Sequence, residues 1–479
     1  MLRIYDSAVR ELRSFVPLTP GRVSIYVCGP TVQSAPHIGH LRSALVYDLW
    51  RRWLTHRGYA VTLVRNVTDV DDKVLDLATE TEPWWARAYR VETEFARSYT
   101  ALGVLPPTHE PRTSGHIPQA LTLIERLLRR GHAYVAGDGS GDVYFDVSSW
   151  QAYGTLTRQT PDAVVDPDEG PGGAKTDPRD FALWKGAKPS DPASARWRSP
   201  WGTGRPGWHI QCSAMSRHYL GRAFDIHGGG LDLRFPHHEN ELAQSTAAGE
   251  EFAKYWVHNG LVTVGGQKMA KSLDNSLYAD ELLRRVGPAT LRYYLLSAHY
   301  RSALDYHQEA LAHTEAAVTR IATFQRRART QLANTASDVP KPPIAFAAAL
   351  DDDLNVPAAL AVLHDHVRAG NIALDNGDAA AVMSAYESVL AMTEVLGAEP
   401  GGFTTAPRAD VQSSTISTLV EVLLANRSHA RDAGDFSTAD RIRNELASAG
   451  IAIQDHTSGT TWTQAQPARA RWPNIPSPG

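Results

Sequence analysis

The sequence has 479 residues, 43% hydrophobic and 21% charged, and this ordinary globular composition excludes a largely disordered chain and favours about three domains. It has no apolar run long enough to span a bilayer, a charged amino-terminus unlike a signal peptide, and only two cysteines, which excludes a disulfide scaffold. The net charge is −4, so a nucleic-acid partner would need a local basic face; we expect a cytoplasmic protein with no membrane partner.

The first predicted elements form a strand–helix–strand unit. Residues 23–27 alternate as in a strand, and apolar residues then recur at helical spacing from residue 38 to about residue 57. Gly58 ends that helix, and residues 61–64 predict the next strand. Such a unit is typical of an α/β fold with a doubly wound parallel sheet of the Rossmann type.

Changes in composition along the chain predict its domains. Pro- and Gly-rich loops mark an insertion between two halves of the sheet domain, and beyond residue 279 the chain becomes helical with linker-like segments at 334–343 and 398–410. The expected bounds are 1–105 and 201–279 for the two halves, 106–200 for the insertion, 280–333 and 334–403 for helical segments, and 404–479 for a small carboxy-terminal domain.

The carboxy-terminal domain shows two helical patterns, over 416–424 and 438–448, and then a candidate hairpin that turns at Ser458-Gly459. Its arginines are either a local basic face or a solvated helix surface, and they are Arg427, Arg431, Arg441 and Arg443.

The tetrapeptide His37-Ile38-Gly39-His40 stands where a predicted strand leads into a helix. Free N–H groups and the helix dipole favour an anion there, and the two histidines can donate hydrogen bonds to phosphate. The alternative is a pair of surface histidines that cap the helix.

A second candidate phosphate-binding segment is lysine-rich, in a chain with only eight lysines. Lys268 and Lys271 follow Gly265-Gly266 and could close over a polyphosphate, or they could lie in a solvated loop. Placed on opposite halves of one nucleotide-binding sheet, the histidine and lysine segments together predict a clamp for the phosphates of ATP.

A third group of residues has the chemistry of a metal site. Cys28 and Cys212 are the only thiols, and His237 and Glu241 lie four residues apart, which places them on one face of a helix. Two thiolates, an imidazole and a carboxylate form a tetrahedral zinc set, whereas the alternative is two buried, inert cysteines. We favour zinc, because Cys28 directly follows the strand that leads to the phosphate segment.

These segments resemble the class I aminoacyl-tRNA synthetases, whose HIGH and KMSKS signatures correspond to HIGH at 37–40 and KMAKS at 268–272. The surrounding segments narrow the resemblance to the cysteinyl-tRNA synthetase family, and it covers nearly the whole chain. They are CGPTV at 28–32, NVTDVDDK at 66–73, DPRDFALWK at 177–185, GRPGWHIQCSAM at 204–215, FDIHGGGLDL at 224–233, FPHHENE at 235–241 and LDDDLNVP at 350–357.

The resemblance implies roles for individual residues. The family's zinc ligands fall on the same four residues, and this zinc binds the substrate thiolate at the floor of the amino-acid pocket. Gly29, Thr68 and Trp208 match positions in that pocket. The ATP-binding positions are His37, Gly39, His40, Asp232 and Lys271, with Lys268 as the other lysine of the loop.

The resemblance also implies the reaction. L-cysteine and ATP form cysteinyl-adenylate, with Mg²⁺ on the phosphates, and the cysteinyl group passes to tRNA(Cys). It implies a monomer with one zinc ion per chain, in which 280–333 contacts the tRNA stem and 404–479 binds the anticodon. Two residues depart from the family pattern: Ala270 replaces a serine of KMSKS, and Gln211 stands where a glutamate is common.

Two other functions stay open at this point. One is a related ligase that joins cysteine to an amino sugar in mycothiol synthesis, but that ligase lacks the anticodon-binding region. The other is a catalytically silent paralogue that binds RNA, against which the retained histidines, lysines and metal ligands argue.

Overall fold

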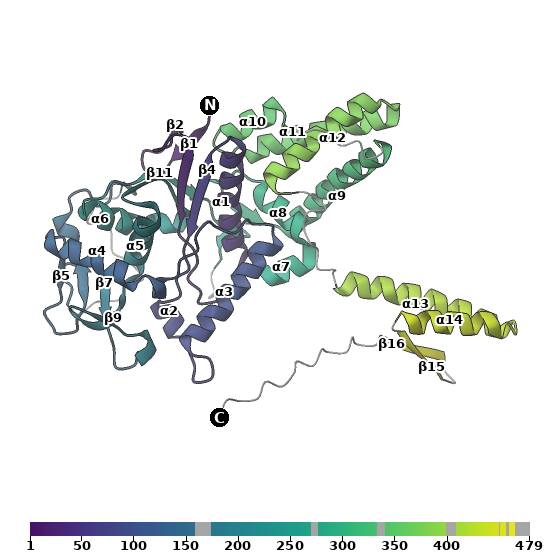
Figure 1. Ribbon diagram of the computed structural model, residues 1–479, viewed down its shortest axis with the longest axis horizontal. Helices are drawn as coiled ribbons and strands as arrows, with labels where there is room; N and C mark the ends of the chain where they lie inside the picture. Colours follow the sequence, from purple (N-terminus) through teal and green to yellow (C-terminus); the bar gives the residue numbers. More distant parts are fainter. Residues whose placement is uncertain are drawn as a thin grey trace. The chain divides into compact units, whose positions relative to one another are not determined.

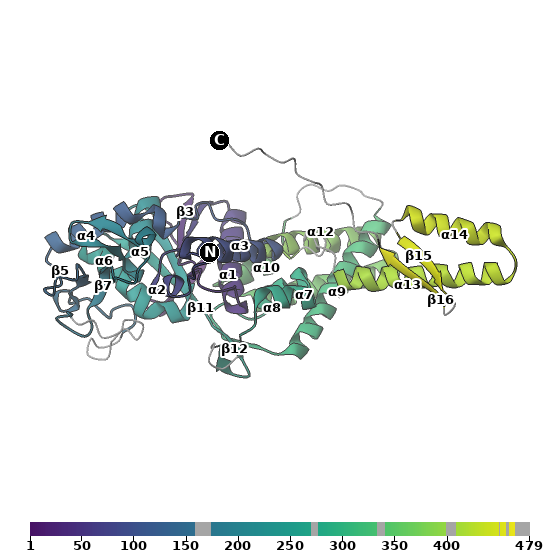
Figure 2. The ribbon, with the colours of Figure 1, turned by 90° about the horizontal axis from the view of Figure 1, so that it is seen from below.

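The structure is a computed structural model that describes residues 1–158, 174–269, 276–332, 341–398, 409–449, 451–456 and 459–464. The chain divides into two units, Met1–Thr404 and Thr405–Gly479. In the first unit the insertion and the carboxy-terminal helices lie at opposite ends, with the central sheet between them, as Figures 1 and 2 both show.

The central sheet is four-stranded and all of its strand pairs are parallel, in the order β11-β10-β3-β4. The strands are β3 (Arg22–Val27), β4 (Ala60–Arg65), β10 (Ala223–Gly230) and β11 (Phe252–Asn259), and helix α1 (Ile38–His56) connects β3 to β4. The predicted strand–helix–strand unit and the doubly wound parallel fold are therefore confirmed.

Both faces of β3 are buried, which explains its apolar sequence. Val23, Ile25 and Val27 pack into the cluster that includes the buried side of α1, whereas Tyr26 faces a second cluster with Met215 of α5 (Trp208–Leu220). Helices thus cover both faces of the sheet, as the two-residue period of a strand allows.

The order of the strands places a crevice beside β3. From β3 the chain passes first to β4 on one side and only later to β10 on the other, so the connections diverge at the carboxyl ends of β3 and β10. Ligands of open α/β sheets bind at such a switch point. Cys28 follows β3 there, and Gly228 to Gly230 end β10.

The insertion folds as a separate antiparallel sheet in the order β5-β6-β7-β9-β8. Its strands are β5 (Ala133–Val135), β6 (Val143–Phe145), β7 (Phe181–Gly186), β8 (Trp197–Ser199) and β9 (Gly202–Pro206). The sheet thus continues to Pro206, where α5 follows, and it packs with α4 (Ile117–Arg129) in one apolar cluster.

The lysine-rich segment begins in a small separate sheet and not in the central sheet, where we expected it. Strand β12 (Val262–Val264) pairs with β13 (Gln267–Lys268) and β14 (Leu304–Tyr306), not with the four-stranded sheet. The expectation that the histidine and lysine segments lie on opposite halves of one sheet is wrong, because the partner of β12 is a strand about forty residues later in the chain.

The remaining helices of the first unit are α2 (Asp72–Leu75), α3 (Trp84–Ala101), α6 (Glu239–Ala247), α7 (Ala279–Val286), α8 (Pro288–Leu296), α9 (Gln308–Gln331), α10 (Ile344–Asp351), α11 (Val356–Asn376) and α12 (Ala379–Leu396). Among them, α3, α8 and α12 contact α1, whereas α6 contacts α5. Arg292 of α8 and Asp48 of α1 form a fully buried ion pair of 2.5 Å, which ties these helices to the sheet domain. Among the described helices, α12 alone has the length and composition of a membrane span. A single such helix is weak evidence for a span, and α12 packs against α9 and α11.

The second unit contains α13 (Ala409–Asp432), α14 (Phe436–Ser448) and a hairpin of β15 (Ile451–His456) and β16 (Gly459–Gln464). The predicted second helix and the terminal hairpin are confirmed. Val420, Ile442, Leu446 and Ile451 form its small core. The arginine prediction needs one correction: Arg431, Arg441 and Arg443 are exposed, but Arg427 is buried with 6% exposure and does not belong to a basic face.

Candidate active site and metal centre

Both histidines of the HIGH segment cap α1. His37 is the N-cap, and its Nδ1 accepts from the backbone N–H of Gly39 at 3.1 Å, while Nδ1 of His40 accepts from the N–H of His37 at 3.2 Å. Since each Nδ1 is an acceptor, the neutral rings carry their hydrogen on Nε2. Burial lowers the pKa of His40 well below its ordinary value, and the neighbouring His37 lowers it further, so this ring is neutral. Both histidines therefore cap the helix, as the alternative interpretation held, and each ring carries its hydrogen on Nε2.

A cavity of about 290 Å³ opens at the carboxyl ends of β3 and β10. It brings together most of the residues that we predicted for ATP and cysteine, together with one predicted metal ligand, Cys28. The predicted ATP and cysteine residues in its lining are His37, Gly39, His40, Asp232, Gly29 and Trp208. Asp232 lies on the short turn η5 (Leu231–Leu233) that follows β10. The capping histidines and Asp232 thus face one cavity although they are almost 200 residues apart in the chain.

Beneath this cavity the structure brings together the four residues of the predicted metal set. One ligand atom from each of Cys28, Cys212, His237 and Glu241 lies within 4.8 Å of the others, and all four residues are buried. Cys28 Sγ lies 3.1 Å from Glu241 Oε1, and His237 Nε2 lies 3.1 Å from the same oxygen. The donor set and its enclosure suit a metal ion that prefers sulfur and nitrogen ligands.

The charges in this cluster favour a cation. Although burial raises the pKa of Glu241, His227 and His237 lower it well below its ordinary value. Burial also raises the pKa of Cys212, but contacts with Cys28 and His237 lower it to about 6. Burial lowers the pKa of His237, yet Glu241 and Cys212 raise it to about 10. A proton on His237 therefore neutralises anionic neighbours, and a metal ion could replace that proton.

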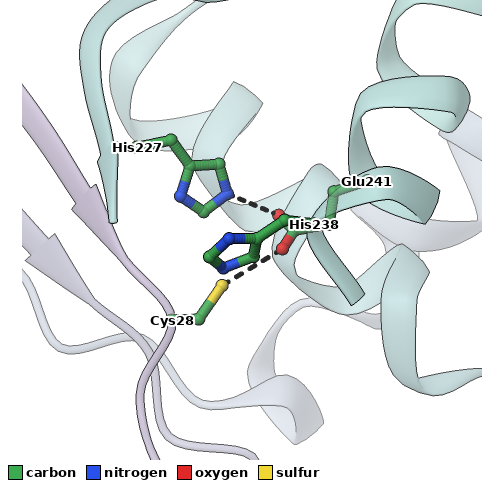
Figure 3. Close-up of side chains that lie close together, drawn as sticks. All are labelled: Cys28, His227, His238 and Glu241. Atoms are coloured by element: carbon green, nitrogen blue, oxygen red, sulfur yellow. Dashed lines mark hydrogen bonds and ion pairs between the residues drawn. The ribbon is translucent and has the colours of Figure 1, made fainter. Parts of the chain in front are cut away.

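A second donor set shares two of these residues. Cys28 and Glu241 also lie near His227 of β10 and His238, as Figure 3 shows, with all four ligand atoms again within 4.8 Å. His227 Nε2 contacts Glu241 Oε2 at 2.9 Å, and His238 Nδ1 is hydrogen-bonded to His258 Nε2 at 2.8 Å. The carboxylate therefore has one oxygen toward His237 and the other toward His227.

The surrounding contacts favour the set that contains His237. The ring of His209 on α5 contacts His237 through the two Nδ1 atoms at 3.0 Å, which leaves Nε2 of His237 toward the cluster. A second hydrogen bond of this kind orients most histidine ligands of metals. In this arrangement His227 orients Glu241 in the same way, so it is a supporting residue.

The three residues predicted for the cysteine pocket lie at different depths. Trp208 stacks on His237 with ring centroids 4.3 Å apart, and Gly29 follows Cys28 along the cavity wall. Thr68 is buried, and its hydroxyl accepts a hydrogen bond from Asn66 Nδ2 at 3.1 Å. Asn66 Oδ1 in turn accepts from the N–H of Gly29 at 2.9 Å, which connects Thr68 to the pocket wall.

Gly29 has no room for a side chain. A Cβ at this position would lie 1.7 Å from the carbonyl oxygen of Asn66, which is backbone and cannot swing away. We expect Gly29→Ala to lower the free energy of unfolding by about 1–3 kcal/mol and to displace Cys28. Denaturant unfolding and metal content measure both effects. Gly115→Ala, where the added Cβ meets open space, is the matched control and should change neither; equal losses in both variants would contradict the steric argument.

The lysine segment lies largely outside the described residues. Lys268 belongs to β13, its side chain is not described, and Lys271 and Ala270 fall within the undescribed residues 270–275. The clamp prediction for the two lysines therefore remains a prediction. Gln211 is buried, and its amide donates to the carbonyl of Val70 at 3.1 Å.

Sequence reasoning missed residues that the tertiary structure brings to the site. His227 and His238 contact the metal cluster, and Lys73 lines the cavity with its Nζ 6.0 Å from the Trp208 ring centroid. All three stand inside sequence segments that resemble the family. Proximity to predicted ligands along the chain was the available signal, since His238 is adjacent to His237.

Comparison with protein families gives three matches along the chain. The model of the tRNA synthetases class I (C) catalytic domain matches residues 14–316, the DALR domain matches 345–398, and the cysteinyl-tRNA ligase anticodon binding domain matches 415–462.

Comparison with individual proteins indicates the same family as the domain matches. The chain is 60% identical over 481 residues to a cysteine–tRNA ligase of Clavibacter michiganensis, with 96% of this chain and 99% of that protein covered. It is 53% identical over 486 residues to a cysteine–tRNA ligase of Micrococcus luteus, with 97% and 99% covered. A solved structure of Mycobacterium tuberculosis methionyl-tRNA synthetase with methionyl-adenylate has a TM-score of 0.56 at 16% identity, covering 78% of this chain and 89% of that one, and it supports the fold alone.

Proposed function

Because the chain belongs to the cysteinyl-tRNA synthetase family, we propose that Cys28, Cys212, His237 and Glu241 hold one zinc ion, which selects the thiolate of the substrate. The protein is a class I cysteine–tRNA ligase and charges tRNA with cysteine at the expense of ATP. The observation that carries the zinc proposal is a buried set of two thiols, an imidazole and a carboxylate beneath the cavity that the HIGH segment lines.

The cavity residues bind and orient the reactants in the first step. The cysteine carboxylate attacks the α-phosphorus of ATP in line, the bond to the β-phosphate oxygen breaks, and pyrophosphate leaves with the electron pair. Nε2–H of His37 and of His40, with Lys268 and Lys271, stabilise the charge on the phosphates, and Mg²⁺ would neutralise part of that charge when bound with ATP. In this proposal Asp232, which lines the same cavity, accepts from the ribose hydroxyls.

The second step transfers the cysteinyl group. The 2′-hydroxyl of the terminal adenosine attacks the carbonyl carbon of the adenylate, and AMP leaves. Residues 415–462 match the anticodon binding domain and bind the other end of the tRNA. Residues 280–333 contact its stem in this proposal, and the enzyme works as a cytoplasmic monomer.

Selection against serine is the main task of the amino-acid pocket, because serine differs from cysteine by one atom. Shape alone separates such near-isosteres by about 10²-fold. When bound, zinc would coordinate the substrate sulfur and lower the pKa of the thiol. The hydroxyl of serine is a much weaker zinc ligand than a thiolate, so serine would bind less well. Trp208, stacked on His237, and Gly29 hold the rest of the substrate against the ion.

The alternative activity, ligation of cysteine to an amino sugar, does not fit this chain. That ligase lacks the anticodon-binding region, whereas residues 415–462 match a cysteinyl-tRNA ligase anticodon binding domain and the second unit contains α13, α14 and the terminal hairpin. A catalytically silent paralogue has no need of the site residues and would be expected to lose them. This chain instead retains the two capping histidines and the four residues of the metal set.

The proposal is tested by ATP–pyrophosphate exchange with cysteine and with serine. We expect about one zinc ion per chain in the purified protein and exchange with serine weaker by far more than the ~10²-fold that shape supplies. Chelation should abolish the exchange with cysteine, and added zinc should restore it. Full cysteine exchange in a metal-free preparation would remove zinc from the mechanism.

The lysine loop provides a separate prediction. Lys271→Ala should lower the rate of adenylate formation by about 10²–10³-fold and leave the KM for cysteine nearly unchanged, because the lysine acts on charge that develops in the transition state. Ala270→Ser, which restores the family serine, is the control and should change the rate little. Pre-steady-state adenylate formation measures both variants, and an unchanged rate in Lys271→Ala would exclude this loop from catalysis.

A further inference from the structure

A second cavity lies behind the turn that carries Asp232. Its volume is about 190 Å³, and Leu231 and Arg234 of this segment line it, whereas Asp232 lines the cavity of the active site. The two cavities therefore share the turn but no lining residue. The other side chains that matter come from three distant segments, and they are Arg10, His258 and Arg301.

The lining of this cavity is positively charged. Arg301 Nε donates to Asp353 at 2.6 Å, so the charge of Arg301 is balanced. Arg10 Nη2 donates to a neutral acceptor, the carbonyl of Thr157, at 2.9 Å. The guanidinium of Arg234 forms no hydrogen bond or ion pair with another described residue, although its backbone N–H donates to Leu231, and no carboxylate lies among the described lining residues. Two guanidinium charges are thus left without an anion.

A buried histidine in the same lining has an unused nitrogen. His258 is 4% exposed, and its Nε2 is hydrogen-bonded to His238 Nδ1 at 2.8 Å. Its Nδ1 has no hydrogen-bond partner among the described residues. Buried polar atoms are nearly always hydrogen-bonded, so this nitrogen requires a ligand or water in the cavity. With Nε2 as acceptor, His258 carries its hydrogen on Nδ1 and donates it to an anion.

The backbone of Arg10 is in an unfavourable conformation. Its φ is +62°, in the left-handed region, at the turn between β1 (Arg3–Asp6) and β2 (Glu11–Ser14). Glycine adopts such angles without steric cost, whereas residues with a Cβ seldom do. Non-glycine residues in such conformations are concentrated at functional sites, and here the strained residue contributes a guanidinium to the cavity.

We propose that this cavity binds an oxyanion of the phosphate class, held by Arg10, Arg234 and the Nδ1–H of His258. Guanidinium groups match the geometry of phosphate oxygens and keep their charge at every physiological pH. The source of the phosphate is either a free small anion or a backbone phosphate of the tRNA. This site is separate from the phosphate-binding segments of the active site, with which it shares only the turn of residues 231–233.

The test is calorimetric titration of inorganic phosphate into the full-length protein at constant ionic strength. A nonhydrolysable analogue of cysteinyl-adenylate saturates the active site, and its own binding is measured first. We expect one phosphate per chain, and roughly tenfold weaker binding in Arg234→Gln, the loss typical of one charged hydrogen bond. Arg10→Gly should weaken phosphate equally without loss of thermal stability, because glycine relieves the backbone strain. Arg284→Gln, an exposed arginine on α7, is the matched control.

The two sources are distinguished by repeating the titration with tRNA bound. Loss of phosphate binding, together with a raised KM for tRNA in Arg234→Gln, assigns the site to a backbone phosphate. Equal phosphate affinity with and without tRNA assigns it to a free anion. The proposal is overturned if phosphate shows no saturable binding, or if it binds Arg234→Gln and Arg10→Gly as tightly as the unaltered protein.

Discussion

Cys212→Ser should release the metal ion and abolish cysteine activation while ATP binding stays nearly intact. Structural zinc sites bind with about 10–16 kcal/mol, so one of four ligands contributes roughly 3 kcal/mol, and an alcohol in place of the thiolate should weaken zinc by more than about 10²-fold. ATP should be spared because Cys212 does not line the cavity that contains His37 and His40. Zinc content, cysteine exchange and ATP titration measure the three effects.

The two donor sets make this experiment specific. Cys212 belongs only to the set with His237, and His238 belongs only to the set with His227. Cys212→Ser should therefore lose zinc, whereas His238→Gln should retain it. Met215→Leu, a conservative change of a buried residue on the same helix, controls for general damage to α5. The opposite result, with zinc lost from His238→Gln and kept in Cys212→Ser, would assign the metal to the other set.

Truncation before Pro407 should separate the two steps of the reaction. All predicted ATP, cysteine and metal residues lie in the unit Met1–Thr404, so cysteine-dependent ATP–pyrophosphate exchange should be largely intact. Charging of tRNA(Cys) should fall by about 10²–10⁴-fold in kcat/KM, the usual gain when two linked modules bind one partner. Both rates are measured on the same preparation, so that misfolding of the first unit would be visible as lost exchange.

Two further measurements control the truncation. The exposed Arg431, Arg441 and Arg443 should contribute to tRNA binding, which in the full-length protein should weaken steeply with salt as phosphate contacts are screened. The truncated protein should show a smaller salt dependence. If it charges tRNA as well as the intact chain does, residues 405–479 have no role in binding the anticodon.

Local patterns in the sequence predicted the elements whose formation depends on near neighbours. Period and a terminal glycine placed the helix that begins at Ile38, and the same reasoning placed the hairpin of β15 and β16. The four metal-set residues were predicted because only two cysteines exist and because FPHHENE resembles a family segment. The helix and the hairpin could be predicted because their contacts lie within a few positions of the chain. The metal set could be predicted because its residue types are rare and stand in recognisable short segments.

Only the tertiary structure decided which distant segments meet. The partner of β12 is β14, and Arg427 turned inward, because long-range packing and not periodicity selects the neighbour of a strand or the buried side of a helix. The contacts of His227 and His238 with the metal set exist because the fold brings β10 close to α6 and to the segment just before it, which ends at His238. The second cavity joins residues 10, 234, 258 and 301, whose separation along the chain leaves no local pattern from which their proximity could be predicted.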